Sequence, residues 1–272
     1  MVEHIYHVLS NHRLLKIPLV IIVTLLTVAF LAFAPEGLLG KADAVGYAVC
    51  HRIDLRSYHI GDRPLPLCAR CTGMYLGAIV GLLYQSLIGK RCSGTPPWRV
   101  IIVFAILALA FVVDGVNSYL TLFPRFPHLY NPHNTLRLIT GTGMGLVISA
   151  LLYPSFQQTI WQNYKEEAAL RDLRRLAILL LLAALVIGLV LTQNPLILYP
   201  LALISAGGVL ILLTMIYTML WIIVLRRENR YLHWQELSTF LILGFGFAVL
   251  QIFLIDIGRY ILTGTWDGFH IG

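Results

Sequence analysis

The sequence predicts an all-α membrane protein with about seven transmembrane helices. Hydrophobic residues make up 58% of the chain and charged residues only 12%, whereas a soluble globular protein carries about 25% charged residues. The mean hydropathy is +0.79, and the apolar residues are gathered into long runs that contain almost no charge. Each run, with its flanks, approaches the roughly 20 residues that a helix needs to cross a bilayer.

Seven apolar runs correspond to the predicted helices. The first is longer than the roughly 7–15-residue core of a signal peptide and no small-residue cleavage site follows it, so we expect it to remain as an anchor. The third contains one charged residue, Asp114, in its second half. In chain order the runs are Ile17–Ala34, Thr72–Gly89, Val100–Val113 with its continuation to Phe123, Leu138–Tyr153, Leu176–Leu191, Pro195–Leu225 and Leu237–Ile255.

Local signals mark where some of these helices begin and end. Asn131-Pro132 is typical of a helix cap followed by a first helical residue, and it precedes the fourth run. The fifth and sixth runs are separated by the short charge-free segment Thr192–Pro195. A longer polar and apolar mixture at 155–175 predicts an amphipathic, helical connector that lies at the membrane interface.

The lysines and arginines predict the orientation of the chain. With the N-terminus in the cytoplasm, twelve of the 20 basic residues fall on the cytoplasmic side, as the positive-inside rule favours. The chain is then a single polytopic domain, 1–272, with a cytoplasmic connector at 155–175 and an extracytoplasmic loop at 35–71. The net charge of +7 is scattered among short loops, so we expect contact with anionic membrane lipids and no binding of nucleic acid.

Small residues recur at four-residue spacing on two of the predicted helices. They form Gly73-x-x-x-Gly77-x-x-x-Gly81 on the second helix and Gly141-x-x-x-Gly145 on the fourth. This pattern allows the backbones of two helices to approach closely within a membrane. We interpret it as helix packing, which would place the adjacent extracytoplasmic loop on a rigid support.

The extracytoplasmic loop carries a metal-like set of side chains. Cys50, His51, Cys68 and Cys71 form a Cys₃His group, and four thiolate or imidazole ligands are what a tetrahedral zinc ion requires. Neighbouring residues such as Cys50 and His51 seldom bind one ion together without strain, so Asp114 or a water molecule is an alternative fourth ligand. The fourth cysteine of the chain, Cys92, falls on the cytoplasmic side.

The same cysteines have a second interpretation as a redox pair. Cys68-x-x-Cys71 lies near the predicted outer surface with Arg70 between the two thiols, where a cation would favour the thiolate. This arrangement resembles that of quinone-coupled thiol–disulfide oxidoreductases, with Cys50 as the relay thiol and quinone as the cofactor. Three cysteines on an oxidising side cannot all pair with one another, which fits metal binding or exchange better than a static disulfide.

Polar residues within the apolar runs are functional candidates because ionisable groups are costly in hydrocarbon. The helix directions place all of them near the outer surface, beneath the cysteine loop. They predict an outward-opening polar cavity, and interhelical ion pairs such as Arg137 with Asp114 are the structural alternative. The residues are Asp114, Asn117, Asn134, Arg137, Asp256 and Arg259.

The arginines of the loop suggest an anionic ligand. Arginine binds carboxylate and phosphate groups through two parallel hydrogen bonds, and Arg52, Arg56 and Arg70 lie within or beside the cysteine motif. We expect these three, together with Arg137, to bind a small anionic substrate that is lipid-linked or carries a carboxylate. Loop salt bridges with Asp54 and Asp62 are the alternative.

Taken together, these residues predict a metal-dependent membrane hydrolase or transferase. Asp114 is the candidate general base and forms a catalytic pair with Arg137, since a carboxylate in an apolar span can act near neutral pH. The predicted substrate-binding residues are Arg52, Arg56, Arg70, Asn117, Asn134, Asp256 and Arg259. A transporter or a structural subunit of a membrane complex is the third hypothesis, and the sequence leaves an oligomer open.

Several short motifs together resemble a family of prokaryotic multi-pass membrane proteins known only as a domain of unknown function. The resemblance covers roughly residues 45–145 and implies a polytopic membrane fold without an assigned activity. The motifs are Cys50-His51-Arg52, Arg56-Ser57, Pro66-Leu67-Cys68-Ala69-Arg70-Cys71-Thr72-Gly73, Asp114-Gly115 and Asn134-x-x-Arg137-x-x-Thr140-Gly141.

Overall fold

Seven long helices form the body of the molecule. The computed structural model describes residues 12–121, 127 and 129–268, and each of the seven helices is long and apolar enough to cross a membrane. The predicted membrane fold and helix count are therefore confirmed. The helices are α2 (His12–Phe33), α4 (Ala69–Ile88), α5 (Trp98–Leu120), α6 (Asn134–Ile160), α7 (Leu173–Leu191), α8 (Pro195–Val224) and α9 (Trp234–Thr263).

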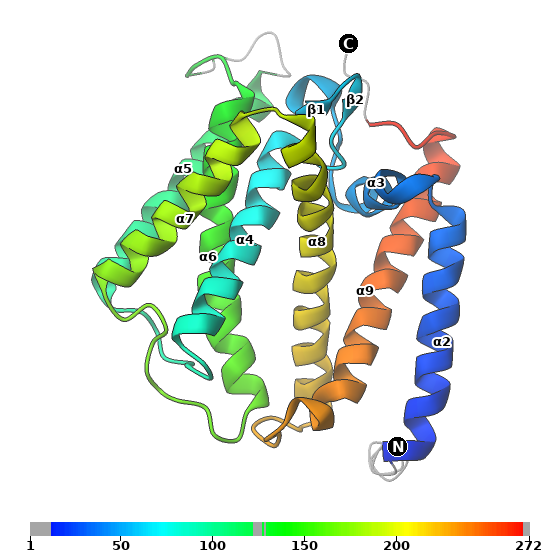
Figure 1. Ribbon diagram of the computed structural model, residues 1–272, viewed down its shortest axis with the longest axis vertical. Helices are drawn as coiled ribbons and strands as arrows, with labels where there is room; N and C mark the ends of the chain where they lie inside the picture. Colours follow the sequence, from blue (N-terminus) through cyan, green and yellow to red (C-terminus); the bar gives the residue numbers. More distant parts are fainter. Residues whose placement is uncertain (1–11, 122–126, 128, 269–272) are drawn as a thin grey trace.

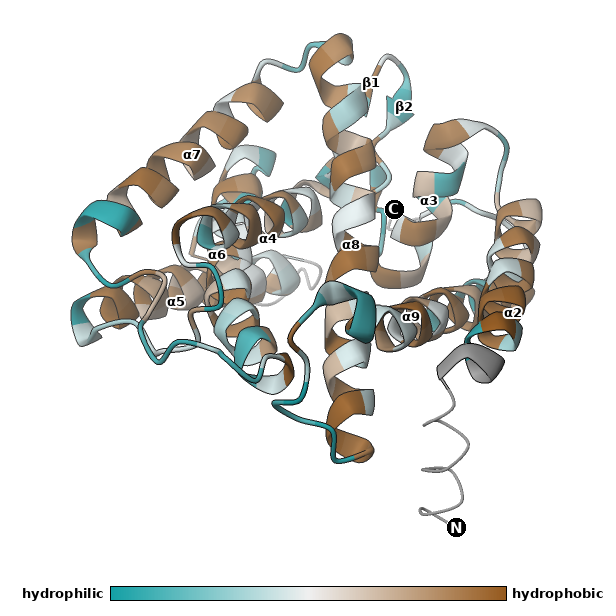
Figure 2. Ribbon diagram, turned by 60° about the horizontal axis from the view of Figure 1, so that its bottom comes forward, coloured by the Kyte–Doolittle hydropathy of each residue, from teal (hydrophilic) through white to brown (hydrophobic). Residues whose placement is uncertain are grey.

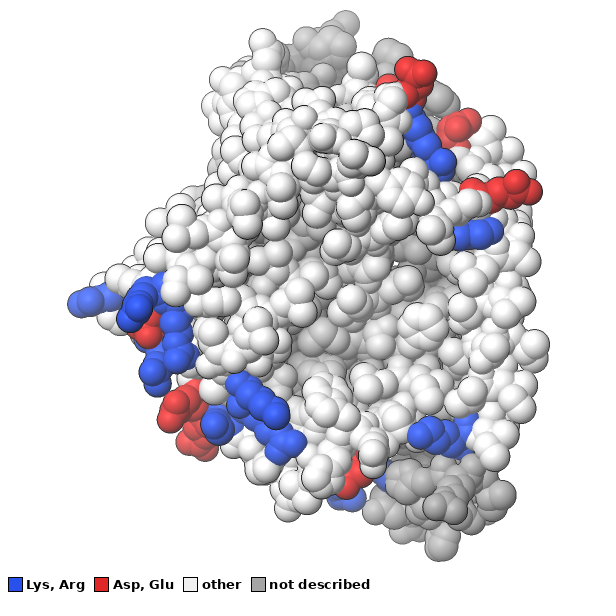
Figure 3. All heavy atoms as spheres, viewed as in Figure 1, with Lys and Arg blue, Asp and Glu red and all other residues white. Residues whose placement is uncertain are grey.

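Successive long helices run in opposite directions, so the start of α2 and the end of α9 lie at opposite ends of the bundle (Figure 1). One end carries residues 35–71 and 264–268, and we call it the cysteine end. Charged side chains border a broad uncharged middle region on the face shown in Figure 3. Which end faces the cytoplasm stays a prediction from the distribution of basic residues.

Helices α4 and α6 pack most closely, through the small residues that the sequence indicated. A Cβ atom added to Gly77 would lie 2.4 Å from the carbonyl oxygen of Thr142, and one added to Gly145 would lie 2.1 Å from that of Met74. Helices α5 and α7 lie beside this pair, while α8, α9 and α2 form the other side (Figure 1). The packing interpretation of the glycine motifs is therefore confirmed.

The outer helices present apolar side chains away from the bundle. Leu185 on α7 and Leu109 on α5 are 59% and 62% exposed, and Figure 2 shows hydrophobic residues along most of both helices. Hydrophilic residues lie mainly on the connections between helices (Figure 2). Exposed leucines of this kind are suited to contact with lipid chains.

The segment 35–71 is more ordered than the predicted loop. It contains a 13-residue helix, α3 (Gly37–Val49), which is too short to span a bilayer and packs against α8 and α9. A single 3₁₀ turn, η1 (Asp54–Arg56), and a two-residue hairpin of β1 (His59–Ile60) and β2 (Arg63–Pro64) follow. The sequence did not suggest α3, because Lys41 and Asp43 interrupt its apolar residues.

Two local predictions need correction. Helix α6 begins at Asn134 rather than Pro132, since the His133 side chain caps it by accepting from the backbone N–H of Leu136 (3.4 Å). The connector 155–175 is helical only to Ile160, and the helix of α7 starts at Leu173. Between them the backbone pairs with other loops: the Lys165 N–H donates to the Arg91 carbonyl (2.8 Å), which excludes a continuous helix.

An apolar groove of about 620 Å³ lies between α4, α6, α8 and α9. It is lined mainly by apolar residues such as Ile79, Leu210 and Phe245. Gln157 and Trp234 are among the few lining residues whose side chains can form hydrogen bonds. A hollow is visible in the uncharged middle of the molecule in Figure 3.

Candidate metal site and arginine cluster

Three of the four predicted metal ligands meet at the cysteine end. The sulfur atoms of Cys50, Cys68 and Cys71 all lie within 4.8 Å of one another, and we call this group the cysteine cluster. A tetrahedral zinc ion with Zn–S bonds of about 2.3 Å holds its sulfurs about 3.8 Å apart. The three sulfurs would therefore need to move only slightly closer together to bind one ion. Cys50 and Cys68 are 6% and 2% exposed, and Cys71 is half-buried.

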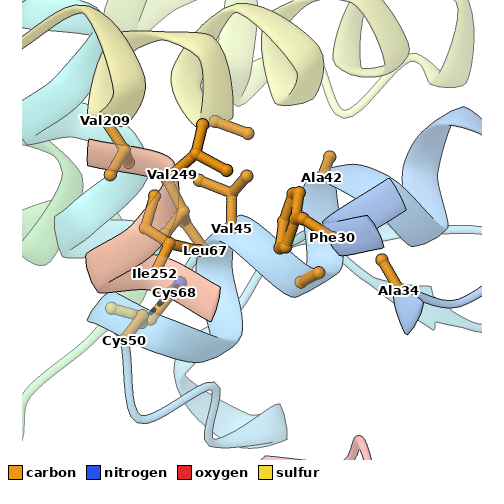
Figure 4. Packing of buried hydrophobic residues seen from close by; sticks show 12 residues of the cluster. Phe30, Ala34, Ala42, Val45, Cys50, Leu67, Cys68, Val209, Val249 and Ile252 are labelled. Atoms are coloured by element: carbon orange, nitrogen blue, oxygen red, sulfur yellow. Dashed lines mark hydrogen bonds between the residues drawn. The ribbon is translucent and has the colours of Figure 1, made fainter. Parts of the chain in front are cut away.

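The ends of two helices bring these sulfurs together. Cys50 follows the last residue of α3, and Cys68 is the N-cap of α4, whose first turn contains Cys71. The backbone N–H of Cys68 donates to the Sγ of Cys50 (3.3 Å), as the dashed line in Figure 4 shows. Around them, Leu67 and Ile252 complete an apolar wall (Figure 4), so the cluster is shielded from water on that side.

The close approach of α3 depends on Gly46. A Cβ atom there would lie 1.9 Å from the carbonyl oxygen of Pro66, a separation that no side chain could accept. Only glycine therefore allows the last turn of α3 to rest on the segment that leads into Cys68.

The three thiols differ in acidity. Hydrogen bonds from the thiols of Cys68 and Cys71 hold the pKa of Cys50 well below its usual range. The same bond to Cys50 raises the pKa of the Cys68 thiol to about 12. A cation is thus needed to ionise the whole cluster, because three neighbouring thiolates repel one another.

Two arginines hold the backbone around Cys50. Arg259 on α9 donates to the carbonyl oxygens of Tyr47 (2.6 Å) and Cys50 (2.8 Å), with its guanidinium 3.9 Å from the centre of the Tyr47 ring. Arg52 has a φ of 49°, a left-handed conformation that is uncommon outside glycine. This conformation aims its N–H at the Cys50 sulfur (3.5 Å).

The strained backbone of Arg52 is anchored through its side chain. Its guanidinium forms an ion pair with Asp43 (2.9 Å) and donates to the carbonyl oxygen of Trp266 (2.9 Å). Asp43 also pairs with Arg63. These contacts hold the Arg52 guanidinium beside Asp43 and Trp266, and the substrate contact of Arg52 stays a prediction.

His51 does not join the cysteine cluster in the described part of the chain. Its Nδ1 accepts a hydrogen bond from the backbone N–H of Ile53 (3.0 Å). Burial lowers the pKa of His51, and the neighbouring charges of Arg56, Arg70 and Arg137 lower it further. The charge of Cys50 acts in the opposite direction and raises the pKa of His51, so the imidazole is influenced by the cysteines as well as by a group of arginines.

Arg56, Arg70 and Arg137 form this second group, which we call the arginine cluster. Arg70 comes from the first turn of α4 and forms an ion pair with Asp114 on α5, while its Nη2 also reaches the Ser118 hydroxyl (2.9 Å). Arg56 donates to the carbonyl oxygen of Ser118 (3.2 Å). Arg70 thus stands between two cysteines in sequence and joins α4 to α5 in space.

Asp114 is fully buried and accepts bonds at both carboxylate oxygens. Its Oδ1 accepts from the Tyr130 hydroxyl (2.9 Å), and its Oδ2 accepts from Arg70 and from the Thr140 hydroxyl (3.3 Å). The ion pair predicted for Arg137 is therefore formed by Arg70 instead. Asp114 is also absent from the set of ligand atoms around the three sulfurs.

The two asparagines tie loops to this region. The Asn117 side chain donates to the Tyr130 carbonyl (2.9 Å) and accepts from the Leu129 N–H (2.7 Å). Asn134 accepts from Arg137 (2.9 Å) and donates to the carbonyl of Ser57 (3.2 Å). Their contacts fix the loops that frame the arginine cluster.

The predicted polar residues fall into two groups rather than one cavity. Asp114 binds Arg70 and Tyr130, Asn117 also binds Tyr130, and Asn134 binds Arg137, whereas Arg259 binds the end of α3. Asp256 on α9 is 0% exposed, and neither of its carboxylate oxygens has a hydrogen-bond partner among the described residues.

Sequence reasoning missed three residues that the site uses. Asp43 is the shared acid of Arg52 and Arg63, and Tyr130 supports Asp114. Tyr75 packs against the buried apolar cluster that includes Cys50 and Cys68. Its position one helical turn after Cys71 is a signal that could have identified it.

The fold and the cysteine cluster define the class: a multi-pass membrane protein with a buried group of cysteines that can hold a metal ion. Residues 50–151 match the family described as Predicted membrane protein (DUF2085). The chain belongs to this family. The matched segment contains both clusters and every predicted site residue except Asp256 and Arg259.

Two archaeal relatives support this assignment. An uncharacterised protein of Methanocaldococcus jannaschii is 30% identical over 122 residues, which cover 45% of this chain and 72% of the relative. An uncharacterised protein of Methanothermobacter thermautotrophicus is 30% identical over 103 residues, which cover 38% of this chain and 83% of the relative. No solved structure matches the chain.

Proposed function

We propose that the protein is a membrane-embedded enzyme that holds a metal ion, zinc by ligand type, and acts on an anionic substrate. The observation that carries the proposal is the buried cluster of Cys50, Cys68 and Cys71 with sulfurs within 4.8 Å of one another. Cysteine thiolates at such spacing favour zinc among the divalent ions available to cells. The charge rule places the site at the outer face of the membrane.

Three protein ligands leave one position of a tetrahedral ion open, as in catalytic rather than structural zinc sites. When bound, such an ion lowers the pKa of a coordinated water molecule and polarises a carbonyl or phosphoryl oxygen. This chemistry belongs to a hydrolase or a transferase. With an open position on the ion, His51 is not required as a fourth ligand. The Nδ1 atom of His51 already accepts a hydrogen bond from the backbone N–H of Ile53.

The surrounding residues then take separate roles. The arginine cluster attracts the anionic part of the substrate, and Asp114 orients Arg70 through their ion pair. Since donors occupy both oxygens of Asp114, we assign it this positioning role in place of the general base predicted from sequence. Arg259 holds the backbone carbonyl of Cys50, and the backbone N–H of Arg52 donates to the Cys50 sulfur.

A second candidate is a thiol–disulfide oxidoreductase coupled to quinone. Cys68 caps α4 and Cys71 lies in its first turn, where the helix N-terminus favours a thiolate. The two thiols would lose two electrons and two protons on forming a disulfide, and a quinone would take up both to become a quinol. The low exposure of Cys50 and Cys68 is unfavourable for attack on another protein, so we rank this candidate second.

Elemental analysis of the purified full-length protein separates the two candidates. We expect about one zinc per chain with reduced cysteines, and loss of the metal in Cys68→Ser. Cys92→Ser is the matched control, because Cys92 is equally buried but lies at the opposite end of the bundle. A metal-free protein that contains a reducible Cys68–Cys71 disulfide would reverse the ranking.

A further inference from the structure

The arginine cluster carries more positive charge than its surroundings balance. Asp114 forms an ion pair with Arg70. In the described ranges of the chain, no carboxylate lies within 4.0 Å of Arg56 or Arg137. Two guanidinium groups are therefore in excess of the single carboxylate.

The excess charge is held in a restricted space. Arg137 is only 6% exposed, and the side chain of Arg70 is 18% exposed. Burial lowers the pKa of Arg56, and the charge of Arg70 lowers it further. Partly buried cations without a counter-ion are costly in free energy. We therefore expect the arginine cluster to bind an anion in the functional state of the protein.

Most of the hydrogen-bond capacity of the cluster is unused. A guanidinium has five N–H donors, yet the described acceptor of Arg137 is the side-chain oxygen of Asn134 and that of Arg56 is the carbonyl of Ser118. The Nε atoms of Arg70 and Arg137 are buried without a hydrogen-bond partner among the described residues. Within the described part of the chain, these two donors therefore have no acceptor from the protein itself.

The three guanidinium groups come from three different elements. Arg56 ends the η1 turn, Arg70 lies in the first turn of α4 and Arg137 in the first turn of α6. Arg56 and Arg70 both contact Ser118, through its carbonyl oxygen and its hydroxyl, and Arg137 is held by Asn134. The ring of Phe111 lies 5.8 Å from the Arg70 guanidinium. An anion bound here would be approached from several directions at once.

We propose that the arginine cluster binds a phosphoryl group, as a phosphate monoester or diphosphate, and that this group is what the site recognises in its substrate. A phosphate dianion matches the two excess charges, and its tetrahedral oxygens can accept from donors in several directions. A carboxylate supplies one charge and two oxygens in one plane. This inference rests on the proposed function, in which the arginine cluster binds the anionic part of the substrate.

The direct test measures the binding of inorganic phosphate to full-length protein in nanodiscs of phosphatidylcholine. We expect saturable binding, weakened by about tenfold or more in Arg56→Gln and in Arg137→Gln, since each removes a charged hydrogen-bond donor. Arg63→Gln is the matched control: Arg63 lies at the same end, is paired with Asp43 and is 45% exposed, so binding should be unchanged.

A stability measurement accompanies the binding test and guards against misfolded variants. Without phosphate, Arg137→Gln should unfold at the same or a higher temperature than the wild type, because an unbalanced buried cation has been removed. Added phosphate should raise the unfolding temperature of the wild type, and at the same phosphate concentration it should raise that of Arg137→Gln by clearly less.

The source of the phosphoryl group is resolved by the choice of probe. Competition by a water-soluble phosphate monoester indicates a small phosphorylated substrate, and competition only by phosphatidic acid in the nanodisc indicates a lipid. The proposal is overturned if no phosphate binds up to about 10 mM, if acetate binds as tightly, or if Arg63→Gln weakens binding as much as Arg137→Gln does.

Failure of this inference can be told from failure of the proposed function. If Cys68→Ser binds phosphate normally while the wild type contains no metal, the metal site is wrong and the phosphoryl site stands. If the wild type contains metal but does not bind phosphate, the phosphoryl site alone is wrong.

Discussion

Arg70 links the two halves of the candidate site. Its backbone lies between Cys68 and Cys71 at the start of α4, and its carbonyl oxygen would be 2.1 Å from a Cβ atom at Gly141. Its side chain binds Asp114 and Ser118 on α5. The position of the cysteines is therefore coupled to the packing of α5 and α6. Substitutions at Asp114 should change the positions of the cysteine sulfurs.

The buried ion pair of Arg70 and Asp114 supplies a test at this scale. Asp114→Ala removes the partner of a partly buried guanidinium and should lower the free energy of unfolding by about 3 kcal/mol or more. Thermal unfolding in detergent measures the change. Asp54→Ala is the control, because Asp54 forms an exposed pair with His59 and is 68% exposed, so its loss should cost at most about 1 kcal/mol. Equal effects in the two variants would contradict the assigned role of Asp114.

At the level of residues, the sequence predicted which side chains gather at the candidate site more successfully than it predicted which of them contact one another. The three cysteines and Asp114 stood out because polar groups are rare in such a chain. The partner of Asp114 was predicted wrongly, because Arg70 rather than Arg137 binds it. A helix pattern does not specify which of several arginines reaches a given neighbour. Asp43 was missed because its helix was not predicted.

Helices α4 and α6 act as one element because their glycines allow contact between backbones. Helix α3, by contrast, could not be foreseen: it is 13 residues long and is held by Arg259 and by contacts with α8 and α9. Its stability therefore comes from tertiary contacts, which local sequence does not report.

Alanine at Gly77 tests the contact between α4 and α6. The new Cβ atom would lie 2.4 Å from the Thr142 carbonyl oxygen, and overpacking of this kind costs about 1–3 kcal/mol. Gly188→Ala on α7 is the control, because apart from the adjacent backbone of α7 itself no atom of the described residues lies within 4 Å of the added carbon. Unfolding measurements should show a loss of stability in Gly77→Ala alone. A neutral Gly77→Ala variant would mean that the two helices are further apart than described.

For the whole molecule, the pattern of apolar runs predicted all seven spans, because burial in lipid requires long uncharged helices whatever their neighbours. The sequence could not specify how the spans surround the site. It placed six polar residues in one cavity, whereas the folded chain separates Asp256 and Arg259 from the group around Asp114. Helix order in a bundle depends on contacts between distant segments, which hydropathy does not encode.

The orientation of the bundle can be tested with single cysteines in a chain whose own cysteines are replaced. Leu55 at the cysteine end is 81% exposed, and Glu166 in the connector is exposed at the other end. We expect an impermeant thiol reagent to label Leu55→Cys in intact cells and Glu166→Cys only after lysis. The reverse labelling would place the cysteine cluster in the cytoplasm.

The central claim is that three cysteine sulfurs bind one metal ion, and X-ray absorption spectroscopy of the metal in the purified protein tests it most directly. The account predicts three sulfur atoms at about 2.3 Å and one nitrogen or oxygen atom at about 2.0 Å. Cys92→Ser should leave the spectrum unchanged. A metal bound without sulfur, or no metal at all, would contradict the account.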